Sequence, residues 1–190
     1  MKLLQDLIIE KGKVINESIL KVDSFLNHQI DPMLMSEIGK AFFEHFHKHN
    51  VTKILTIEAS GIAVAVMAGF YLQVPVIFGK KQKPSTFSEH FYKKMVTSFT
   101  KNVDYEVCVS KEFLHPCDRI LIIDDFLAHG NALKALYDIT IESGAEVVGA
   151  GIVIEKAFQK ARQNLEGLNL DIFSLAIINS LKHNQVEFLK

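Results

Sequence analysis

Short apolar runs alternate with helical stretches between Lys53 and Lys156, and few folds accommodate this order. The runs KILTIE, PVIFGK, RILIIDD and EVVGAGIVIE are rich in Ile, Leu and Val without strict polar alternation, which is typical of strands buried on both faces. The helical stretches GIAVAVMAGFYLQ and NALKALYDITIES lie between such runs. This pattern predicts an α/β protein with a mostly parallel sheet flanked by helices.

The composition agrees with one globular domain. The chain has 190 residues, of which 48% are apolar and 23% charged, and this excludes a disordered or coiled-coil chain. Lys and Arg number 21 against 22 Asp and Glu, so no basic field is available to hold nucleic acid or an anionic membrane. The apolar runs are too short to span a bilayer and lack the flanks of a signal peptide. We therefore expect a cytoplasmic protein without a nucleic-acid or membrane partner.

Neither cysteines nor histidines form an evident metal motif. Cys108 and Cys117 lack metal-type spacing and are interpreted as reduced, structural residues. His45, His47 and His49 are separated by one-residue gaps, which on a helix scatter the rings around the axis. They are interpreted as surface residues.

The remaining segments are less regular. Two helices are predicted in the first fifty residues, one at LLQDLII and one after the cap Asp31-Pro32. Between them, GKVINESILKVDSFLNHQ suits an irregular or weakly extended segment. Residues 80–104 form a polar arm that is long for a structureless connection, and both a mobile lid and a β-hairpin arm fit it.

Chemistry is expected where strands end, because open parallel sheets bind ligands beyond the carboxyl ends of their strands. An apolar strand ends at Asp124-Asp125, and a loop with Gly130 leads to a helix that begins near Asn131. Two carboxylates can accept hydrogen bonds from vicinal sugar hydroxyls or hold Mg²⁺, and a helix N-terminus with its loop amides can hold a phosphate. The residues predict a sugar-phosphate site, although a solvated acidic turn with a helix cap would have the same pattern.

The segment ILIIDDFLAHGNA, Ile120 to Ala132, resembles the thirteen-residue phosphoribosyl-diphosphate motif of type I phosphoribosyltransferases. The resemblance implies the fold of that family and a catalytic site in which Asp124 and Asp125 bind the ribose hydroxyls. It also implies a loop for the 5-phosphate, formed by Ala128, His129, Gly130, Asn131 and Ala132.

The loop departs from the usual family pattern. His129 and Asn131 replace threonine and a glycine or lysine, and Ala132 has no hydroxyl to donate. Phosphate binding is therefore expected to depend on backbone amides and the Asn131 side chain. Ala128 stands where hypoxanthine-guanine enzymes have a catalytic aspartate, so a general base must come from elsewhere or be unnecessary.

The same resemblance implies a pyrophosphate loop after KILTIE, with backbone amides of Ala59, Ser60 and Gly61 near the ligand. A plain strand-to-helix turn would look the same. Lys81 lies in a lysine-rich turn that resembles that of adenine phosphoribosyltransferases, and it would neutralise the leaving pyrophosphate; a solvated lysine patch is the alternative. In the family this lysine often reaches the neighbouring subunit, which implies a homodimer. Magnesium is the implied cofactor, carried by the diphosphate substrate without a protein ligand assigned.

The base is expected under a small hood built from the terminal segments. We expect residues 1–50 to form N-terminal helices and hood, 51–155 the core with the arm, and 156–190 the rest of core and hood. The chain as a whole is similar to bacterial family members that act on xanthine, and this implies base contacts at Leu20, Asn27 and Lys156. Lys156 can donate to the O6 atom of an oxopurine but not to the amino group of adenine. A core leucine, a turn asparagine and a surface lysine are the structural alternatives.

The expected activity is purine salvage: xanthine and 5-phosphoribosyl 1-diphosphate would give xanthosine 5'-monophosphate and pyrophosphate. Catalysis would depend on stabilising the leaving group and excluding water rather than on a covalent intermediate. Two alternatives stay open. The base can be hypoxanthine, guanine or orotate, or the chain can be a non-catalytic regulator that senses the phosphoribosyl donor, against which the near-zero net charge argues.

Overall fold

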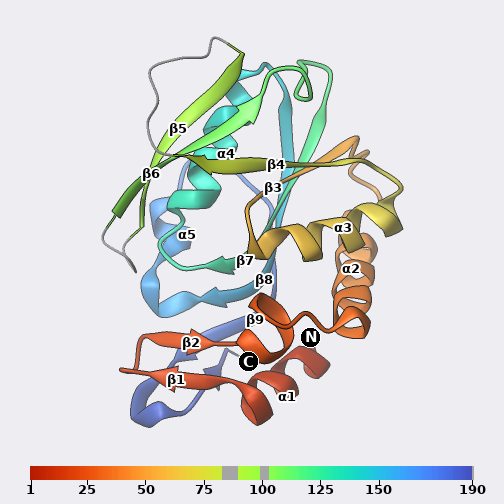
Figure 1. Ribbon diagram of the computed structural model, residues 1–190. Coiled ribbons are helices and arrows are strands. Elements are labelled where there is room, and N and C mark those ends of the chain that lie inside the picture. Colours follow the sequence, from red (N-terminus) through yellow and green to blue (C-terminus); the bar gives the residue numbers. More distant parts are fainter. Residues whose placement is uncertain (83–89, 99–102, 190) are drawn as a thin grey trace.

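The computed structural model describes residues 1–82, 90–98 and 103–189. Its main strands are β3 (Lys53–Ile57), β4 (Val76–Gln82), β5 (Phe91–Ser98), β6 (Val103–Ser110), β7 (Arg119–Leu127), β8 (Glu146–Lys156), β9 (Ile172–Ser180) and β10 (Glu187–Phe188). Within the described ranges they form one sheet of eight strands in the order β10-β9-β8-β7-β3-β4-β6-β5 (Figure 1). The pairs β9–β8, β8–β7, β7–β3 and β3–β4 are parallel, and the outer pairs are antiparallel. The prediction of an α/β fold with a mostly parallel sheet is confirmed.

Helices cover both faces of the sheet. They are α2 (Pro32–Phe46), α3 (Ser60–Leu72), α4 (Asn131–Glu142) and the short α5 (Ala161–Asn164). Leu121 and Ile123 of β7 belong to the buried cluster that includes α2 and α3, whereas Ile120 and Ile122 belong to the cluster that includes α4. Alternate side chains of one strand are thus buried on opposite faces, which explains why its sequence is continuously apolar from Ile120 to Ile123.

The chain termini form a group of elements at one end of the core, which we call the hood and which shares β10 with the central sheet. It consists of α1 (Lys2–Lys11), β1 (Lys13–Ile15), β2 (Ile19–Lys21), the π-helical turn η1 (Asp23–Asn27), the 3-10 turn η3 (Lys182–Asn184) and β10. These elements lie together below the core in Figure 1. The backbone N–H of His183 donates to Glu17 Oε1 at 2.8 Å, and the Met1 ammonium donates to the carbonyl of Leu175. The two ends of the chain therefore support one another.

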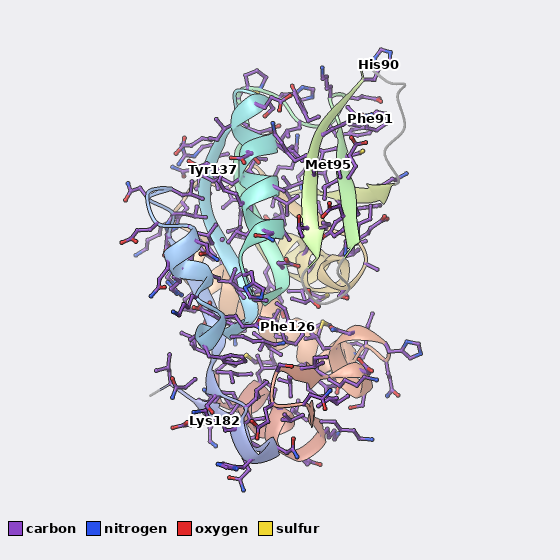
Figure 2. The ribbon with its side chains drawn as sticks, turned by 90° about the vertical axis from the view of Figure 1, so that its left-hand side faces the viewer. His90, Phe91, Met95, Phe126, Tyr137 and Lys182 are labelled. Carbon is purple, nitrogen blue, oxygen red and sulfur yellow. The ribbon has the colours of Figure 1, made fainter. Side chains whose placement is uncertain are left out.

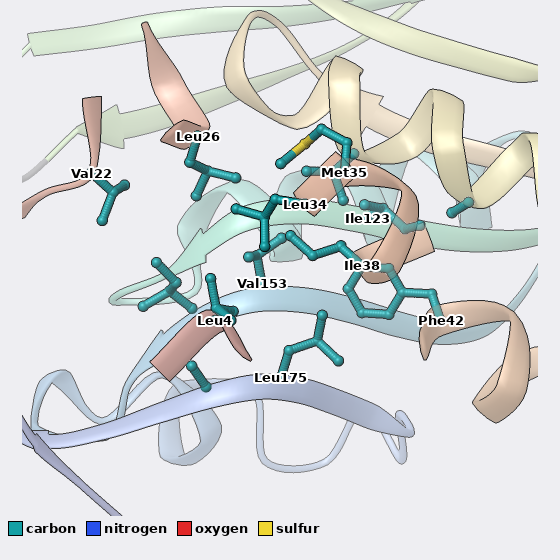
Figure 3. Close-up of a cluster of buried hydrophobic side chains, with 14 of the residues drawn as sticks. Leu4, Val22, Leu26, Leu34, Met35, Ile38, Phe42, Ile123, Val153 and Leu175 are labelled. Atoms are coloured by element: carbon teal, nitrogen blue, oxygen red, sulfur yellow. The ribbon is translucent and has the colours of Figure 1, made fainter. Parts of the chain in front are cut away.

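A cluster of buried side chains joins the hood to the core. Figure 3 shows Leu4 of α1 and Leu26 of η1 beside Leu34 of α2, Val153 of β8 and Leu175 of β9. The second predicted helix begins as expected, because the Asp31 carboxylate caps α2 by accepting from the N–H groups of Met33 at 2.9 Å and Leu34 at 3.2 Å. The segment between the predicted helices is a hairpin with strands of three residues followed by a π-helical turn, strands too short to show a polar alternation.

The polar arm contains a β-hairpin in its described part, and this hairpin, β5 with β6, is called the arm from here on. β5 pairs antiparallel with β6 from Phe91↔Ser110 to Ser98↔Val103, and β6 continues the sheet beside β4. Residues 83–89 and 99–102, which belong to the predicted arm, lie outside the described residues. Figure 2 shows β5 running alongside α4, with Met95 on the strand and Tyr137 on the helix. In the described ranges, no helix has the length and apolar character needed to cross a membrane.

Candidate active site

Asp124 and Asp125 lie near the carboxyl end of β7, in the middle of the sheet. The strand does not end at these acids as the sequence suggested, because Phe126 and Leu127 still pair with β8. Asp124 is 5% exposed, and its Oδ1 accepts from the backbone N–H of Asp125 at 3.0 Å. The two acids are therefore held by a continuous strand rather than by a turn.

The environment of Asp124 favours the protonated carboxyl. Burial raises the pKa of Asp124 well above its usual value, and the charge of Asp125 raises it further. The Lys81 ammonium acts in the opposite direction and lowers this pKa. Hydroxyl donors of a ligand would stabilise the ionised form in the same way, so the site is suited to a hydroxylated sugar.

Lys81 is brought to this carboxylate by two contacts. Its backbone N–H donates to Glu58 Oε1 at 2.5 Å, and its Nζ lies 5.2 Å from the ring centroid of Tyr105. Burial raises the pKa of Tyr105, and the charge of Asp124 adds to the effect. The charged or polar groups of Lys81, Tyr105 and Asp124 thus influence one another within a single chain.

The loop 128–132 joins β7 to the N-terminus of α4. Gly130 has φ 88° and ψ 0°, a left-handed conformation that favours glycine, and α4 begins at Asn131 without a side-chain cap. A pocket of about 130 Å³ is bounded by this loop, by Asp124 and by Val96, Thr97 and Tyr105 of the arm. Uncapped amides at a helix N-terminus favour an anion, and here they share a pocket with a carboxylate suited to a sugar.

The side chain of Asn131 differs from the expectation. Its Nδ2 donates to the backbone carbonyl of Thr97 at 3.0 Å, so the amide holds the arm rather than facing an open phosphate position. Ala132, which follows within the first turn of α4, contributes no polar side chain. In this structure the anion-binding capacity of the loop comes from its backbone.

The loop at Ala59 lies beside the acidic pair. The Glu58–Ala59 peptide bond is cis, and α3 starts at Ser60. A Cβ on Gly61 would lie 2.3 Å from Thr56 Oγ1 and 3.5 Å from Asp124 Oδ1. A glycine is therefore needed at position 61 so that α3 can start directly over β3 and the Asp124 carboxylate. The sequence suggested a different reason for this glycine, namely close approach of the main chain to a ligand.

The three predicted base contacts all involve the hood. Lys156 ends β8, and its Nζ donates to the carbonyl of Ser18 at 3.0 Å in the turn between β1 and β2. The same Nζ lies 5.4 Å from the ring centroid of Phe126, and burial lowers the pKa of Lys156. Figure 2 shows Phe126 where the core meets the hood.

Leu20 and Asn27 lie on neighbouring hood elements. Leu20 on β2 is 5% exposed and packs in the buried cluster, next to Gly12. Asn27 ends η1, and its Oδ1 is buried without a hydrogen-bond partner in the described structure. An unpaired buried oxygen is costly, and a ligand N–H would satisfy it.

Two of the three histidines converge, contrary to the sequence interpretation. His45 Nε2 lies 2.9 Å and His49 Nε2 3.7 Å from Asp171 Oδ2, because α2 ends at Phe46 and the turn that follows brings His49 back beside His45. The His45 ring also stacks on Phe173 with centroids 4.0 Å apart. Among the described residues, no group of three or more His, Cys, Asp or Glu side chains is placed to hold a metal ion.

Several residues of the pocket were missed by the sequence analysis. Thr97 and Tyr105 come from the arm, and Phe126 lies between the acids and the loop 128–132. No spacing in the sequence connects the arm with the loop, because antiparallel pairing of β5, β6 and β4 brings them together. Only Phe126 was identifiable, as an apolar position within the motif.

The fold and site define a class of protein that binds a phosphorylated sugar at the carboxyl ends of parallel strands. The family model "Phosphoribosyl transferase domain" matches residues 26–187, and the chain belongs to this family. The chain is 53% identical over 186 residues to xanthine phosphoribosyltransferase from Staphylococcus aureus (strain bovine RF122 / ET3-1), covering 98% of this chain and 97% of the relative. It is 52% identical over 188 residues to the Clostridium novyi (strain NT) protein of the same name, covering 99% of each.

Solved structures support the fold. Adenine phosphoribosyltransferase from Rhodothermus marinus DSM 4252 superposes with a TM-score of 0.75 at 18% identity, covering 94% of this chain and 100% of that one. The Giardia lamblia enzyme complexed with 9-deazaadenine also gives a TM-score of 0.75 at 18% identity, covering 92% and 96%. The type I phosphoribosyltransferase fold implied by the sequence resemblance is confirmed.

Proposed function

We propose that the protein transfers the phosphoribosyl group of 5-phosphoribosyl 1-diphosphate to xanthine, giving xanthosine 5'-monophosphate and pyrophosphate. The observation that carries the proposal is the adjacency of two sites on neighbouring strands. β7 carries Asp124 and leads to the loop 128–132, and the adjacent β8 ends at Lys156 next to the hood. The carboxyl ends of two neighbouring strands thus offer groups for a sugar phosphate and, beside them, a donor for an oxopurine. The identity of about half the residues with two curated xanthine phosphoribosyltransferases supports the choice of base.

In this proposal the 5-phosphate binds the backbone amides of Ala128, His129, Gly130, Asn131 and Ala132. Asp124 and Asp125 accept hydrogen bonds from the ribose hydroxyls. Fixing the ribose at both ends leaves its C1 atom facing the base, and orientation of this kind lowers the barrier to a two-substrate reaction. The bond from C1 to the diphosphate oxygen breaks with its electron pair going to pyrophosphate. A ring nitrogen of the base bonds to C1, and its proton passes to the departing pyrophosphate.

The leaving pyrophosphate is assigned to the second loop and the lysine next to it. Backbone amides of Ala59, Ser60 and Gly61 face the departing oxygens, and the Lys81 ammonium neutralises their charge. The hydrogen bond from Lys81 N–H to Glu58 supports this assignment, because it ties the lysine strand to the loop. Thr97 and Tyr105 border the pocket of the loop 128–132 and would limit the access of water there.

Magnesium fits the residues as a partner of the substrate. Mg²⁺ usually binds through one or two carboxylates, several waters and substrate phosphates, and Asp124 and Asp125 offer this donor set. When bound, the ion would neutralise charge on the diphosphate. Among the described residues, no three His, Cys, Asp or Glu side chains lie close enough together to hold a metal ion. We therefore assign no ligand set that consists of protein side chains alone.

The base is placed between the core and the hood. Lys156 donates to O6, Asn27 supplies its unpaired Oδ1 to a ring N–H, and Leu20 contacts the ring. Burial lowers the pKa of Lys156, which indicates that its ammonium group is poorly hydrated. A hydrogen bond from this group to a carbonyl oxygen of the base would therefore form with little competition from water.

We also propose a homodimer in the cytoplasm. The large exposed apolar side chains Val66 and Phe70 on α3, Phe78 on β4 and Phe113 support an interface between copies, and Phe78 and Phe113 border a hollow of about 570 Å³. Both cysteines are free thiols, as expected in a reducing compartment. Sedimentation of the wild type and of Phe70→Asp tests the dimer, which the charged variant should dissociate.

The decisive experiment is an assay of the pure protein with phosphoribosyl diphosphate, Mg²⁺ and each base in turn. We expect turnover with xanthine to exceed that with hypoxanthine, guanine, orotate and adenine. A preference for another base would correct the substrate, and absence of turnover with every base would reject the enzymatic function.

A further inference from the structure

The short helix α5 touches the loop 128–132 from outside the pocket. The Asn164 side-chain Nδ2 donates to the backbone carbonyl of His129 at 3.0 Å. The next residue, Leu165, packs directly against Gly130, since a Cβ built there would lie 3.2 Å from Leu165 Cγ and Cδ1. Neither residue borders the phosphate pocket. Both therefore support the loop from the side that a ligand does not contact.

The other side of α5 is anchored to the sheet. Arg162 donates from Nε to Glu155 Oε1 at 2.8 Å and from an amino group to Oε2 at 2.9 Å, and it also donates to the carbonyl of Ile172 at 3.0 Å. Ser174 Oγ donates to Glu155 Oε2 at 2.5 Å. Glu155 is 2% exposed and immediately precedes Lys156. A bidentate pair with a buried carboxylate fixes an arginine side chain more firmly than a fully exposed ion pair does.

The anchoring matters because α5 has four residues and is too short to be stable as an isolated helix. Its position is determined by its contacts with β8 and β9 on one side and with the loop on the other. Residues 160–165 thus connect the end of β8, where the base donor Lys156 lies, with the loop that carries Gly130.

We propose that Asn164 is a positioning residue that sets the orientation of the phosphate loop. The peptide between His129 and Gly130 is trans and planar, so the N–H of Gly130 points opposite to the carbonyl of His129. Holding that carbonyl on the side of α5 turns the Gly130 N–H away from α5, toward the pocket that Gly130 borders. A carbonyl turned into the pocket would instead repel an anion. This inference rests on the proposed function, because it assigns the pocket to the 5-phosphate.

The test compares Asn164→Ala and Asn164→Asp with Gln163→Ala, an exposed neighbour on the same helix. Aspartate has nearly the shape of asparagine, but its carboxylate cannot donate to the His129 carbonyl and repels it. We expect Asn164→Ala to raise the KM for phosphoribosyl diphosphate about fivefold, and Asn164→Asp to raise it more, while the KM for xanthine changes less than twofold. Gln163→Ala should match the wild type.

A second measurement keeps this inference separate from the activity. Isothermal titration calorimetry with ribose 5-phosphate should show a loss of affinity in both Asn164 variants that parallels their increase in KM. Their thermal unfolding temperatures should stay close to that of the wild type. Equal affinity in wild type and variants, no binding by the wild type, or parallel increases in both KM values would overturn the positioning role. Failure of the wild type to convert xanthine while the variants lose ribose 5-phosphate binding would reject only the proposed function.

Discussion

The side-chain amide of Asn131 donates a hydrogen bond of 3.0 Å to the main-chain carbonyl of Thr97. It joins the first turn of α4 to the arm strand β5, and both residues border the pocket assigned to the 5-phosphate. The arm is therefore fastened to the phosphate loop by a residue of the motif itself. Its amide, which the sequence suggested as a phosphate donor, has a structural partner.

Replacing Asn131 by alanine should loosen the arm next to the pocket. A neutral hydrogen bond contributes about 0.5–1.5 kcal/mol, so we expect faster amide hydrogen exchange across β5 and an increase of about fivefold in the KM for phosphoribosyl diphosphate. Asp138→Asn on the same helix, which loses only its ion pair with Lys134, is the control. Unchanged exchange in β5 would show that the hydrogen bond does not hold the arm.

The double replacement Asp124→Asn with Asp125→Asn should abolish turnover and leave the fold intact. Each charge-assisted hydrogen bond to a ribose hydroxyl is worth about 1.5–3 kcal/mol, so the loss of two exceeds a hundredfold in kcat/KM. Steady-state kinetics and circular dichroism measure the two effects. Near-native activity of a folded double variant contradicts the assignment.

Asp124→Asn alone should make the protein more stable at neutral pH while it loses activity. The folded state binds the Asp124 proton more tightly than the unfolded chain, because burial and Asp125 raise this pKa. The free energy of unfolding attributable to Asp124 therefore falls as the pH rises above the unfolded pKa of about 3.9, by up to about 1.4 kcal/mol per unit, until the folded pKa is passed. The asparagine variant does not incur this loss.

Urea unfolding between pH 4 and pH 8 tests this prediction. The stability difference between Asp124→Asn and the wild type should grow with pH and then level off. Asp104→Asn, at an exposed position, serves as the control and should show no such trend. A difference that shrinks with rising pH would mean that the Asp124 carboxylate is stabilised in the fold.

Gly130→Val should weaken binding of the phosphoribosyl donor far more than binding of the base. Its φ of 88° disfavours any side chain, and a Cβ would press on Leu165, so the loop amides would shift. Gly167→Val is a matched control, because Gly167 has φ 94° but no neighbour within 4 Å of a built Cβ. Both variants should lose stability, and only Gly130→Val should raise the KM for phosphoribosyl diphosphate. Equal changes in both KM values would make the loop a structural turn.

Lys156→Ala should remove the preference for oxopurines. Without the ammonium group, O6 of xanthine has no donor in a poorly hydrated place, a loss of about 1–3 kcal/mol, so turnover of xanthine should fall tenfold or more. Affinity for phosphoribosyl diphosphate in the absence of base should stay unchanged, as it should in the exposed control Lys182→Ala. Weakened donor binding with intact discrimination against adenine would place Lys156 in the phosphate site instead.

The local sequence was sufficient for the central sheet and the acidic motif. β3, β7 and β8 are buried on both faces and therefore mostly apolar, and α4 follows a loop with a glycine that adopts a positive φ. Asp124, Asp125 and the loop 128–132 are contiguous, so their proximity depends on one strand-loop-helix unit. For the same reason, the capped start of α2 at Asp31 was predictable.

The sequence alone thus determined the class of fold, the family and the strand-loop-helix unit that holds Asp124, Asp125 and residues 128–132, since each is encoded by neighbours along the chain. Only the tertiary structure decided what surrounds that loop. Thr97 and Tyr105 reach the pocket through antiparallel pairing across the arm, Lys156 meets the Ser18 carbonyl across 138 positions, and Asn164 supports His129 from a helix too short to predict. These contacts arise from the packing of segments that are distant in sequence. The periodicity and spacing of residues within one segment do not indicate which distant segment packs against it.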